Sequence, residues 1–284
     1  MKRMFKALAL TLALVLCTGI AGCTSSSAPA ASKSSAADGS AKFKILEGSL
    51  ATEEYGIGFR KGDELCNIVN AAMKVLKADG TLAQISEKWF GSDITTIQPD
   101  AKALDNVKSE PRNFVLGLDD SFPPMGYRDS KNQIVGFDID MATAVCKKLG
   151  WTLKLQPIDW DAKELELNSK NIDCIWNGMT MTDERKASMS CSDPYLRNEQ
   201  VVVVKADSGY QSSADLAGKS LALQTGSSAE DALNSQPDFK KSLGKVNTFD
   251  NNMNCFMDLE QGSSDAVLVD SIVADWYITT GNLE

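Results

Sequence analysis

Short β-prone runs alternate with helical segments along most of this chain, and this alternation constrains its fold more than any other feature. The run QVVVVK at 200–205 is continuously apolar, as in a strand that is buried on both faces. DAVLVD at 265–270 is another short apolar run, and the helical segment SIVADWYITTG follows it directly. Strands that alternate with helices are typical of sheets covered by helices. The sequence therefore predicts an α/β fold with largely parallel sheets.

The segment that follows residue 42 predicts two strands and two helices. Residues 43–47 and 55–59 are short, apolar and β-prone. Apolar residues then recur at helical spacing from residue 63 to residue 79, where Asp-Gly ends the run. Thr81 begins a second helix, and Gln84 three residues later completes the pattern of a capping box.

Residues 96–112 lose this periodicity and contain two prolines, so we expect a linker there. A new unit begins at Asn113 with a strand and a loop, and Asp138 is expected to cap a helix that ends at Leu149. Three further strands are expected, at 153–158, 173–176 and 219–224. Further helices are expected at about 161–169 and at 214–216, and two more are expected to begin at about residues 182 and 226.

Charge and composition exclude several classes of function. The formal net charge is −9, and it is about −12 without Lys2, Arg3 and Lys6 of the leader. So acidic a chain is a poor partner for nucleic acid or anionic lipid. It has no histidine, which excludes Ser-His-Asp and Cys-His catalysis and any His-ligated metal site. We therefore expect no metal and no cofactor.

The N-terminus has the pattern of an export signal. Basic MKRMFK precedes the apolar run ALALTLALVLCTGIAG, which ends at Cys23. This resembles a bacterial lipoprotein signal, in which residues 20–23 form the lipobox and Cys23 is lipidated. An ordinary signal peptide and an uncleaved anchor helix are the alternatives. Residues 24–42 are rich in Ser and Ala and are expected to be a flexible tether.

Five cysteines follow the leader, and none belongs to a CxxC pair. An odd number cannot all be bridged internally, and three lie in apolar patterns. We therefore expect buried free thiols rather than a disulfide framework. The five are Cys66, Cys146, Cys174, Cys191 and Cys255.

The order of the motifs from residue 113 onward resembles the solute-binding proteins of polar amino-acid ABC importers, of the family 3 type. The segments that carry this resemblance are FVLGLDDSFPPMGY, NQIVGFDIDMATAVCKKLGW, DCIWNGMTMTDERK, SDPYL, DLAGKSLALQTGSSAEDAL and DAVLVD. In that family the last helix is followed by a strand, a crossing strand and two helices ending in a KWFG-like motif. Here the matching segment is residues 43–91, before the rest.

The chain therefore looks circularly permuted, since it ends in TTGNLE where FKILEG would ordinarily continue. Surface turns tolerate such new chain ends. Two unrelated modules or a mis-joined sequence are the alternatives, but a 50-residue piece with two strands and a helix pair could hardly bury a core of its own.

The resemblance implies a periplasmic-binding-protein type II fold, in which two α/β lobes are joined by two crossing strands. Carried over to this chain, lobe 1 comprises residues 56–95 and 112–204, and lobe 2 comprises residues 43–55 and 205–284. Residues 96–111 would then link the family's usual termini. The tether would leave from lobe 2.

The resemblance also implies a ligand site in the cleft between the lobes. Arg185 would hold the carboxylate of an amino acid through paired hydrogen bonds, with help from the amide of Ser228. Asp270, Thr180 and the carbonyl of Gly178 would hold the ammonium group. A surface ion pair is the alternative role for Arg185, a plain turn for Ser228, and an N-cap for Asp270.

The remaining site residues would meet the ligand's side chain. Phe122 and Trp160 match positions of aromatic rings around that side chain, although isolated aromatics are more often core. Asp119, Asn177 and Gln224 match positions that contact it or lie close by. Because Gln224 stands where some relatives have Lys, and Asp119 suits a cation or an amide, we expect a polar or basic amino acid.

The expected function is extracytoplasmic capture of an amino acid by a lipid-anchored, monomeric protein that passes it to an ABC permease. Closure of the lobes on the ligand would create a form that the permease can distinguish from the empty protein. One alternative is an amino-acid sensor without import. Another is a dehydratase-like enzyme on the same fold, which would need a carboxylate or Lys as acid or base.

Overall fold

The computed structural model describes residues 41–281. The predicted signal peptide, the lipidation of Cys23 and nearly all of the predicted tether lie outside these described residues. No helix within residues 41–281 is both long and apolar enough to span a membrane.

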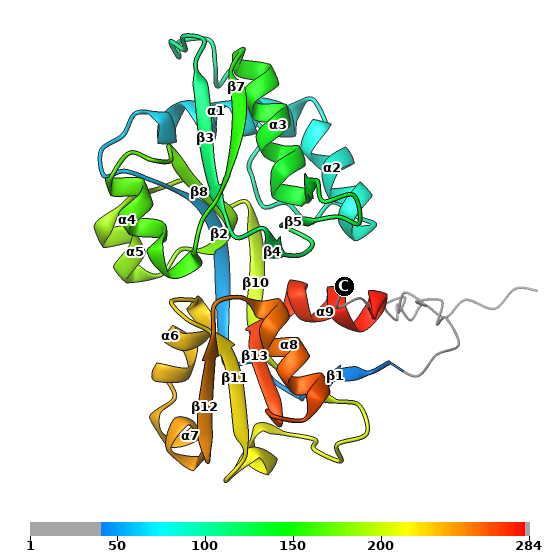
Figure 1. The fold of residues 1–284 in the computed structure, drawn as a ribbon. Helices are drawn as coiled ribbons and strands as arrows, with labels where there is room; N and C mark the ends of the chain where they lie inside the picture. Colours follow the sequence, from blue (N-terminus) through cyan, green and yellow to red (C-terminus); the bar gives the residue numbers. More distant parts are fainter. Residues whose placement is uncertain (1–40, 282–284) are drawn as a thin grey trace, which may run out of the picture. The chain divides into compact units, whose positions relative to one another are not determined.

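Eight strands form the continuous path of the main sheet, in the order β12-β11-β13-β10-β2-β8-β3-β7 (Figure 1). Neighbours are parallel at both ends of this path, whereas β10 and β2 are antiparallel to each other and to their outer neighbours. The strands are β2 (Ala51–Phe59), β3 (Asn113–Leu118), β7 (Thr152–Pro157), β8 (Cys174–Thr180), β10 (Leu196–Lys205), β11 (Ser220–Gln224), β12 (Lys245–Phe249) and β13 (Ala266–Asp270), with β1 (Phe43–Ile45) and β9 (Ser190–Cys191) paired to β10 and β2.

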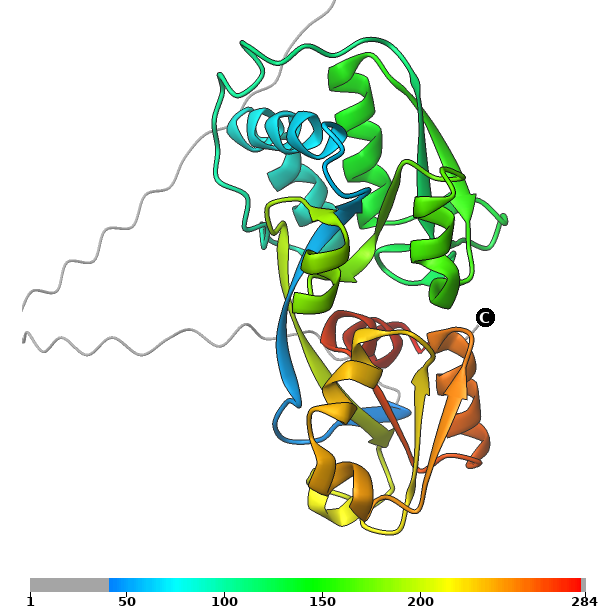
Figure 2. The same ribbon diagram turned by 90° about the vertical axis from the view of Figure 1, so that its left-hand side faces the viewer.

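The sheet divides into two lobes that β2 and β10 join. Lobe 1 contains β8, β3 and β7, and lobe 2 contains β12, β11 and β13 (Figures 1 and 2). Residues 51–55 of β2 pair with residues 196–200 of β10 between them. The prediction of an α/β fold with two lobes and two crossing strands is confirmed.

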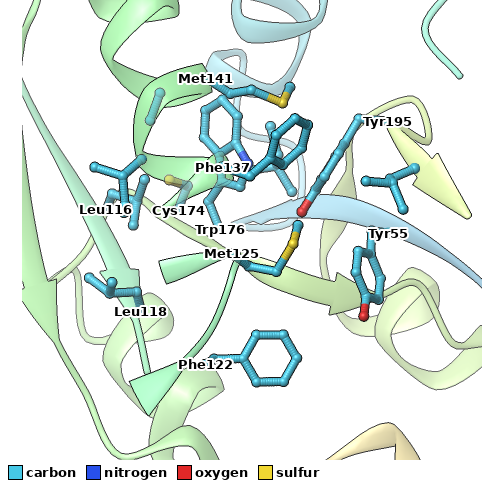
Figure 3. Packing of buried hydrophobic residues seen from close by; sticks show 14 of the residues in the cluster. Tyr55, Leu116, Leu118, Phe122, Met125, Phe137, Met141, Cys174, Trp176 and Tyr195 are labelled. Carbon is cyan, nitrogen blue, oxygen red and sulfur yellow. The ribbon is translucent and has the colours of Figure 1, made fainter. Parts of the chain in front are cut away.

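In lobe 1, helices cover both faces of the sheet. α1 (Leu65–Ala78), α2 (Thr81–Phe90) and α3 (Phe137–Leu149) pack together on one face, and α4 (Lys163–Asn168) lies against the other. Figure 3 shows Trp176, Phe137 and Tyr195 within the first of these layers, and Phe122 and Tyr55 at its edge. The lobe also contains a small sheet, a 3₁₀ turn and a short helix: β4 (Ser121–Phe122), β5 (Gly126–Arg128), β6 (Ile134–Val135), η1 (Trp160–Ala162) and α5 (Asp183–Ser188).

In lobe 2, the central strand β13 is buried on both faces. Val267 and Val269 pack on the side covered by α8 (Asn252–Gln261) and α9 (Ser271–Thr280). Ala266 and Leu268 pack on the opposite side, which α6 (Ser228–Asn234) covers and α7 (Pro237–Ser242) extends. This alternation explains why residues 266–269 are all apolar, with an Asp on each side of them.

Several local predictions differ from the structure. Thr81 is the first residue of α2 rather than its cap, and its hydroxyl donates to Asp79 Oδ1 at 2.6 Å, so no capping box forms. Gly136, not Asp138, is the N-cap of α3. Residues 201–204, assigned to lobe 1 by the sequence, pair with β13 in lobe 2. The elements β12, α7 and α8 were not predicted.

Residues 96–112 contain no helix or strand, as expected of the linker. They nevertheless lie against lobe 1, because Ile97 is buried in its core and the Thr96 amide donates to the Tyr195 carbonyl at 3.0 Å. The beginning of the linker is therefore packed against lobe 1.

The five cysteines within residues 41–281 are free thiols, as expected. Four are buried, whereas Cys191 is half-buried. Burial raises the pKa of Cys66 to about 11 and that of Cys146 to about 12. These thiols are therefore protonated and unreactive at neutral pH.

Asp138 is fully buried in lobe 1, where it accepts hydrogen bonds instead of capping a helix. Its Oδ2 accepts from the Gly178 amide at 2.7 Å and from the Tyr195 hydroxyl at 2.9 Å. Burial raises the pKa of Asp138 to about 7, although both hydrogen bonds oppose this shift.

We predict that Asp138 makes the folded state more stable in mild acid than at neutral pH. Between about pH 4 and the raised pKa near 7, the folded protein holds a proton that the unfolded chain has lost, so the contribution to stability falls as pH rises. Asp138→Asn should flatten the decline in the unfolding free energy over this range. An unchanged pH slope in denaturant titrations of the variant would contradict this assignment.

Candidate functional site

All ten cleft residues predicted from the sequence line one small cavity, and Ser227 is the one further lining residue. They are Asp119, Phe122, Trp160, Asn177, Gly178, Thr180, Arg185, Gln224, Ser228 and Asp270. Six of them lie at, or within three residues of, the carboxyl ends of β3 and β8 in lobe 1 and of β11 and β13 in lobe 2: Asp119, Asn177, Gly178, Thr180, Gln224 and Asp270. Ligand sites of open α/β sheets form at such carboxyl ends of strands.

A buried guanidinium group is part of the cavity lining. Arg185 is 5% exposed; its Nη1 donates to the Thr180 carbonyl at 2.9 Å and its Nη2 to the Gly226 carbonyl at 3.2 Å. Burial lowers its pKa, but arginine keeps its charge at any physiological pH. Within residues 41–281 no ion pair includes Arg185, so its charge is not balanced by a contacting carboxylate.

A buried carboxyl group, that of Asp270, also lines the cavity. Asp270 closes β13, is 5% exposed, and accepts hydrogen bonds on Oδ1 from the Tyr55 hydroxyl at 2.6 Å and from Asn198 Nδ2 at 2.7 Å. Burial raises the pKa of Asp270 to about 7, and the charge of Glu53 acts in the same direction. Asp270 also has the N-cap position of α9, but its side chain makes no capping hydrogen bond.

Asp119 of lobe 1 is hydrogen-bonded to lobe 2 and to its own lobe. Gln224 Nε2 donates to Asp119 Oδ2 at 2.8 Å, across the cleft. Asp119 Oδ1 also accepts from the amide and hydroxyl of Ser121. Burial raises the pKa of this carboxyl. Asn177 Oδ1 accepts from the Asp119 amide at 3.2 Å, while its buried Nδ2 has no partner in the part of the chain that the structure describes.

Lys163 is a cleft residue that sequence reasoning missed. It is 5% exposed, and its Nζ donates to the carbonyls of Trp160 at 3.1 Å and of Gly226 at 2.9 Å. Gly226 O therefore accepts from two cations of lobe 1, because Arg185 donates to it as well. Burial lowers the pKa of Lys163 to about 8, and repulsion from Arg185 adds to the shift.

Sequence reasoning also missed polar residues of the crossing strands. Glu53 Oε2 accepts from Thr180 Oγ1 at 2.9 Å, Asn198 Nδ2 at 2.9 Å and Gln200 Nε2 at 3.0 Å. The signal was present in the alternation along β2, which places Glu53 on the same face as Tyr55. The predicted strand began only at residue 55 and so omitted it.

Comparisons with known proteins point to one family. The family model described as bacterial extracellular solute-binding proteins, family 3, matches residues 15–92 and 114–274. The arginine-binding extracellular protein ArtP of Bacillus subtilis (strain 168) is 32% identical over 180 residues, which cover 62% of this chain and 68% of ArtP. The L-cystine-binding protein TcyJ of Escherichia coli (strain K12) is 30% identical over 213 residues, covering 74% of this chain and 75% of TcyJ.

A solved structure gives the same result for the fold. An ABC uptake transporter substrate-binding protein from Streptococcus pneumoniae, with bound histidine, aligns at 39% identity and a TM-score of 0.57. The alignment covers 58% of this chain and 68% of that one. The type II periplasmic-binding-protein fold expected from the sequence is thereby confirmed, both by the family match and by the similarity to this solved structure.

We predict that Gly178→Ala will destabilise the protein more than an ordinary glycine substitution. Gly178 has a φ of +55°, and an added Cβ would lie 2.7 Å from Phe122 Cε1. The backbone strain costs about 1 kcal/mol and the collision about 1–3 kcal/mol more. Gly150→Ala is the matched control, because Gly150 has a φ of +71° with open space around its Cα. Equal losses of unfolding free energy in the two variants would contradict this packing.

Proposed function

The chain belongs to the bacterial extracellular solute-binding proteins of family 3, and from this premise we propose that it captures a free polar or basic L-amino acid and delivers it to an ABC permease. The ligand lies between the two lobes, whose closure around it completes the site. In this proposal the chain binds its ligand as a monomer, without cofactor or turnover.

The arrangement of charge in the cavity carries this proposal. Arg185 and Asp270 both line this cavity, and neither takes part in an ion pair within the described residues. An amino acid presents a carboxylate and an ammonium group to such a pair. Charge-assisted hydrogen bonds contribute about 1.5–3 kcal/mol each, so four to six would offset the cost of association and reach about −8 kcal/mol, a micromolar affinity.

The surroundings of Asp119 favour a ligand with a cationic side chain. Asp119 also lines a second cavity of about 610 Å³ at the outer side of the cleft, together with Trp160. The charged residues around this outer cavity are mostly acidic: Asp120, Asp129, Asp159, Asp250 and Arg128. Their field would attract a cation and raise its rate of association. The names of ArtP and TcyJ, which refer to arginine and L-cystine, agree with a polar or basic ligand.

We further propose that the mature protein is held outside the cytoplasm by lipid on Cys23. The apolar run that ends at Cys23 and the basic residues before it support this, and the family's extracellular location agrees with it. Several acyl chains on one cysteine would anchor the protein firmly, since a single chain binds only marginally.

The order of the elements supports a circular permutation of the family's fold. β1, β2, α1 and α2 precede β3 in the chain, yet β2 pairs with β10 and β8 in the middle of the sheet. α9, at the other end of the described chain, lies against β1. We propose that residues 92–112 join the two points of the fold that are the C-terminus and the N-terminus in unpermuted relatives.

A ligand screen tests the proposed function. We expect one or a few of the twenty amino acids, cystine and ornithine to raise the melting temperature of the soluble chain from residue 41. Ligand at a thousandfold over its dissociation constant adds about 4 kcal/mol, and each kcal/mol raises Tm by about 2–4 °C. The bound ligand should be recovered unchanged. A cooperative melt that no candidate shifts would overturn amino-acid capture.

Arg185→Ala supplies the matched test of the site. Loss of two charge-assisted hydrogen bonds should weaken binding of the ligand by at least about 100-fold without unfolding the protein, as measured by calorimetry and circular dichroism. Arg197→Ala, which removes an exposed arginine from β10, should bind normally. Equal affinities in the two variants would remove Arg185 from the carboxylate site.

The permutation is tested by restoring the other order of segments. A chain in which residues 113–284 precede residues 43–91, joined through a short flexible loop, should fold and bind the same ligand within about tenfold of the original affinity. A product that fails to melt cooperatively would count against the permutation.

A further inference from the structure

Glu53 and the cavity residue Asp270 share a hydrogen-bond donor. Asn198 Nδ2 donates to Glu53 Oε2 at 2.9 Å and to Asp270 Oδ1 at 2.7 Å, so one amide nitrogen bridges the two carboxyl groups. Glu53 also accepts from Thr180 Oγ1 and from Gln200 Nε2. Glu53 thus touches the ligand cavity through Thr180 and Asn198 rather than directly.

Within residues 41–281, neither Glu53 nor Asp270 is in an ion pair with Lys or Arg. The guanidinium of Arg185 donates to carbonyls and contacts neither carboxyl group. Its charge acts on both of them from a distance, as it does on Asp231 of α6. On the β2 side the Tyr55 hydroxyl donates to Asp270 and stays protonated, because burial and Asp270 raise the pKa of Tyr55.

Two negative charges so close together are unfavourable when one of them is buried, as Asp270 is, unless one takes up a proton or a cation arrives. Burial and the charge of Glu53 together raise the pKa of Asp270 to about 7, against the opposing hydrogen bond from Tyr55. In the ligand-free protein, therefore, the protonated form of Asp270 is favoured up to a higher pH than in an ordinary aspartate.

We propose that Glu53 is a positioning residue that sets the charge of the ammonium subsite, so that capture of an amino acid expels a proton from Asp270. This inference rests on the proposed function and specifies how its site works. The ligand's ammonium group replaces the proton as the counter-charge, Asp270 becomes a carboxylate, and the proton passes to solvent. No covalent bond of the ligand changes.

The direction of the pH effect follows from this exchange. A cation next to Asp270 lowers its pKa in the complex, so the complex holds fewer protons than the free protein below about pH 7. Affinity should then be constant above about pH 8 and fall by up to tenfold per pH unit below about pH 7. Ligand release would be favoured in mild acid.

Calorimetry of the wild-type protein with the amino acid found by the screen provides the first test. Binding enthalpies in phosphate and in Tris buffer at about pH 6.5 give the number of protons released, because the two buffers differ in their heats of ionisation. We expect a net release of about half a proton or more per ligand, shrinking toward zero at about pH 8. Tight binding with no proton release at about pH 6.5 would overturn the inference and leave the proposed function intact.

Glu53→Gln provides the second test, because glutamine keeps an acceptor oxygen at this position and removes the charge. The onset of weakening should move to lower pH, proton release at about pH 6.5 should drop by about half or more, and affinity at about pH 8 should fall by about tenfold. Glu54→Gln is the matched control, since Glu54 is the next residue of β2 and is exposed. It should keep the wild-type pH profile.

Two outcomes of this comparison would reject the role of Glu53. One is a Glu53→Gln variant with the wild-type pH profile and proton release. The other is an equal change in both glutamine variants, which would reflect net charge alone. A purely structural role for Glu53 would lower affinity uniformly across pH without changing the proton count. If no amino acid binds the wild-type protein at all, the proposed function fails, and this inference fails with it.

Discussion

The antiparallel pairing of β2 with β10 is the interaction on which the rest of this structure depends. Residues 51–55 and 196–200 carry the chain between the lobes and keep the two parallel halves of the sheet in one register. Their side chains also hold cavity residues from behind: Tyr55 and Asn198 donate to Asp270, Gln200 donates to Ser228, and Glu53 accepts from Thr180. The strands that join the lobes therefore also support the binding site.

Buried charge in the cleft is stabilised mainly by backbone and amide groups. The Gly226 carbonyl accepts from Arg185 and Lys163, and Gln224 links Asp119 to lobe 2. An unpaired ion in such a place would be costly, because burial removes its hydration. Hydrogen bonds to the charged groups offset this cost, and they cross between the lobes, so the same contacts that solvate the charges also hold the cleft closed.

The sequence predicted the architecture because its strongest signals are periodic. Continuous apolar runs identified β10 and β13, and helical spacing identified α1 and α9. The family resemblance of the motifs gave ten of the eleven cavity residues, all but Ser227. What failed were local signals that tertiary contacts override. Asp138 has the chemistry of an N-cap, yet the core uses it to hold Gly178 and Tyr195. Three elements went unpredicted: β12, α7 and α8. Few of their residues are buried, so the sequence shows only a weak apolar period there.

Glu53 and Lys163 show a second limit. Both are charged residues of a kind usually found on the surface, and their burial depends on partners more than 60 positions away, such as Asn198 and Gly226. Reading a short stretch of the sequence therefore cannot identify those partners. The alternation along β2 indicates that Glu53 faces the same side as Tyr55, but the predicted strand began four residues too late and left Glu53 out.

The order of the elements also affects how the molecule is made. Lobe 1 occupies one uninterrupted stretch of chain between the two crossing strands, whereas lobe 2 draws β1 from one side of that stretch and β11 to β13 from the other. During synthesis β2, β3, β7, β8 and β9 have all been translated before β11. Lobe 1 thus has its full set of sheet partners early, while β1 must wait some 160 residues for β10. The cleft is the last part of the sheet to be complete, because Asp270 stands at the end of β13, the last strand of the described chain.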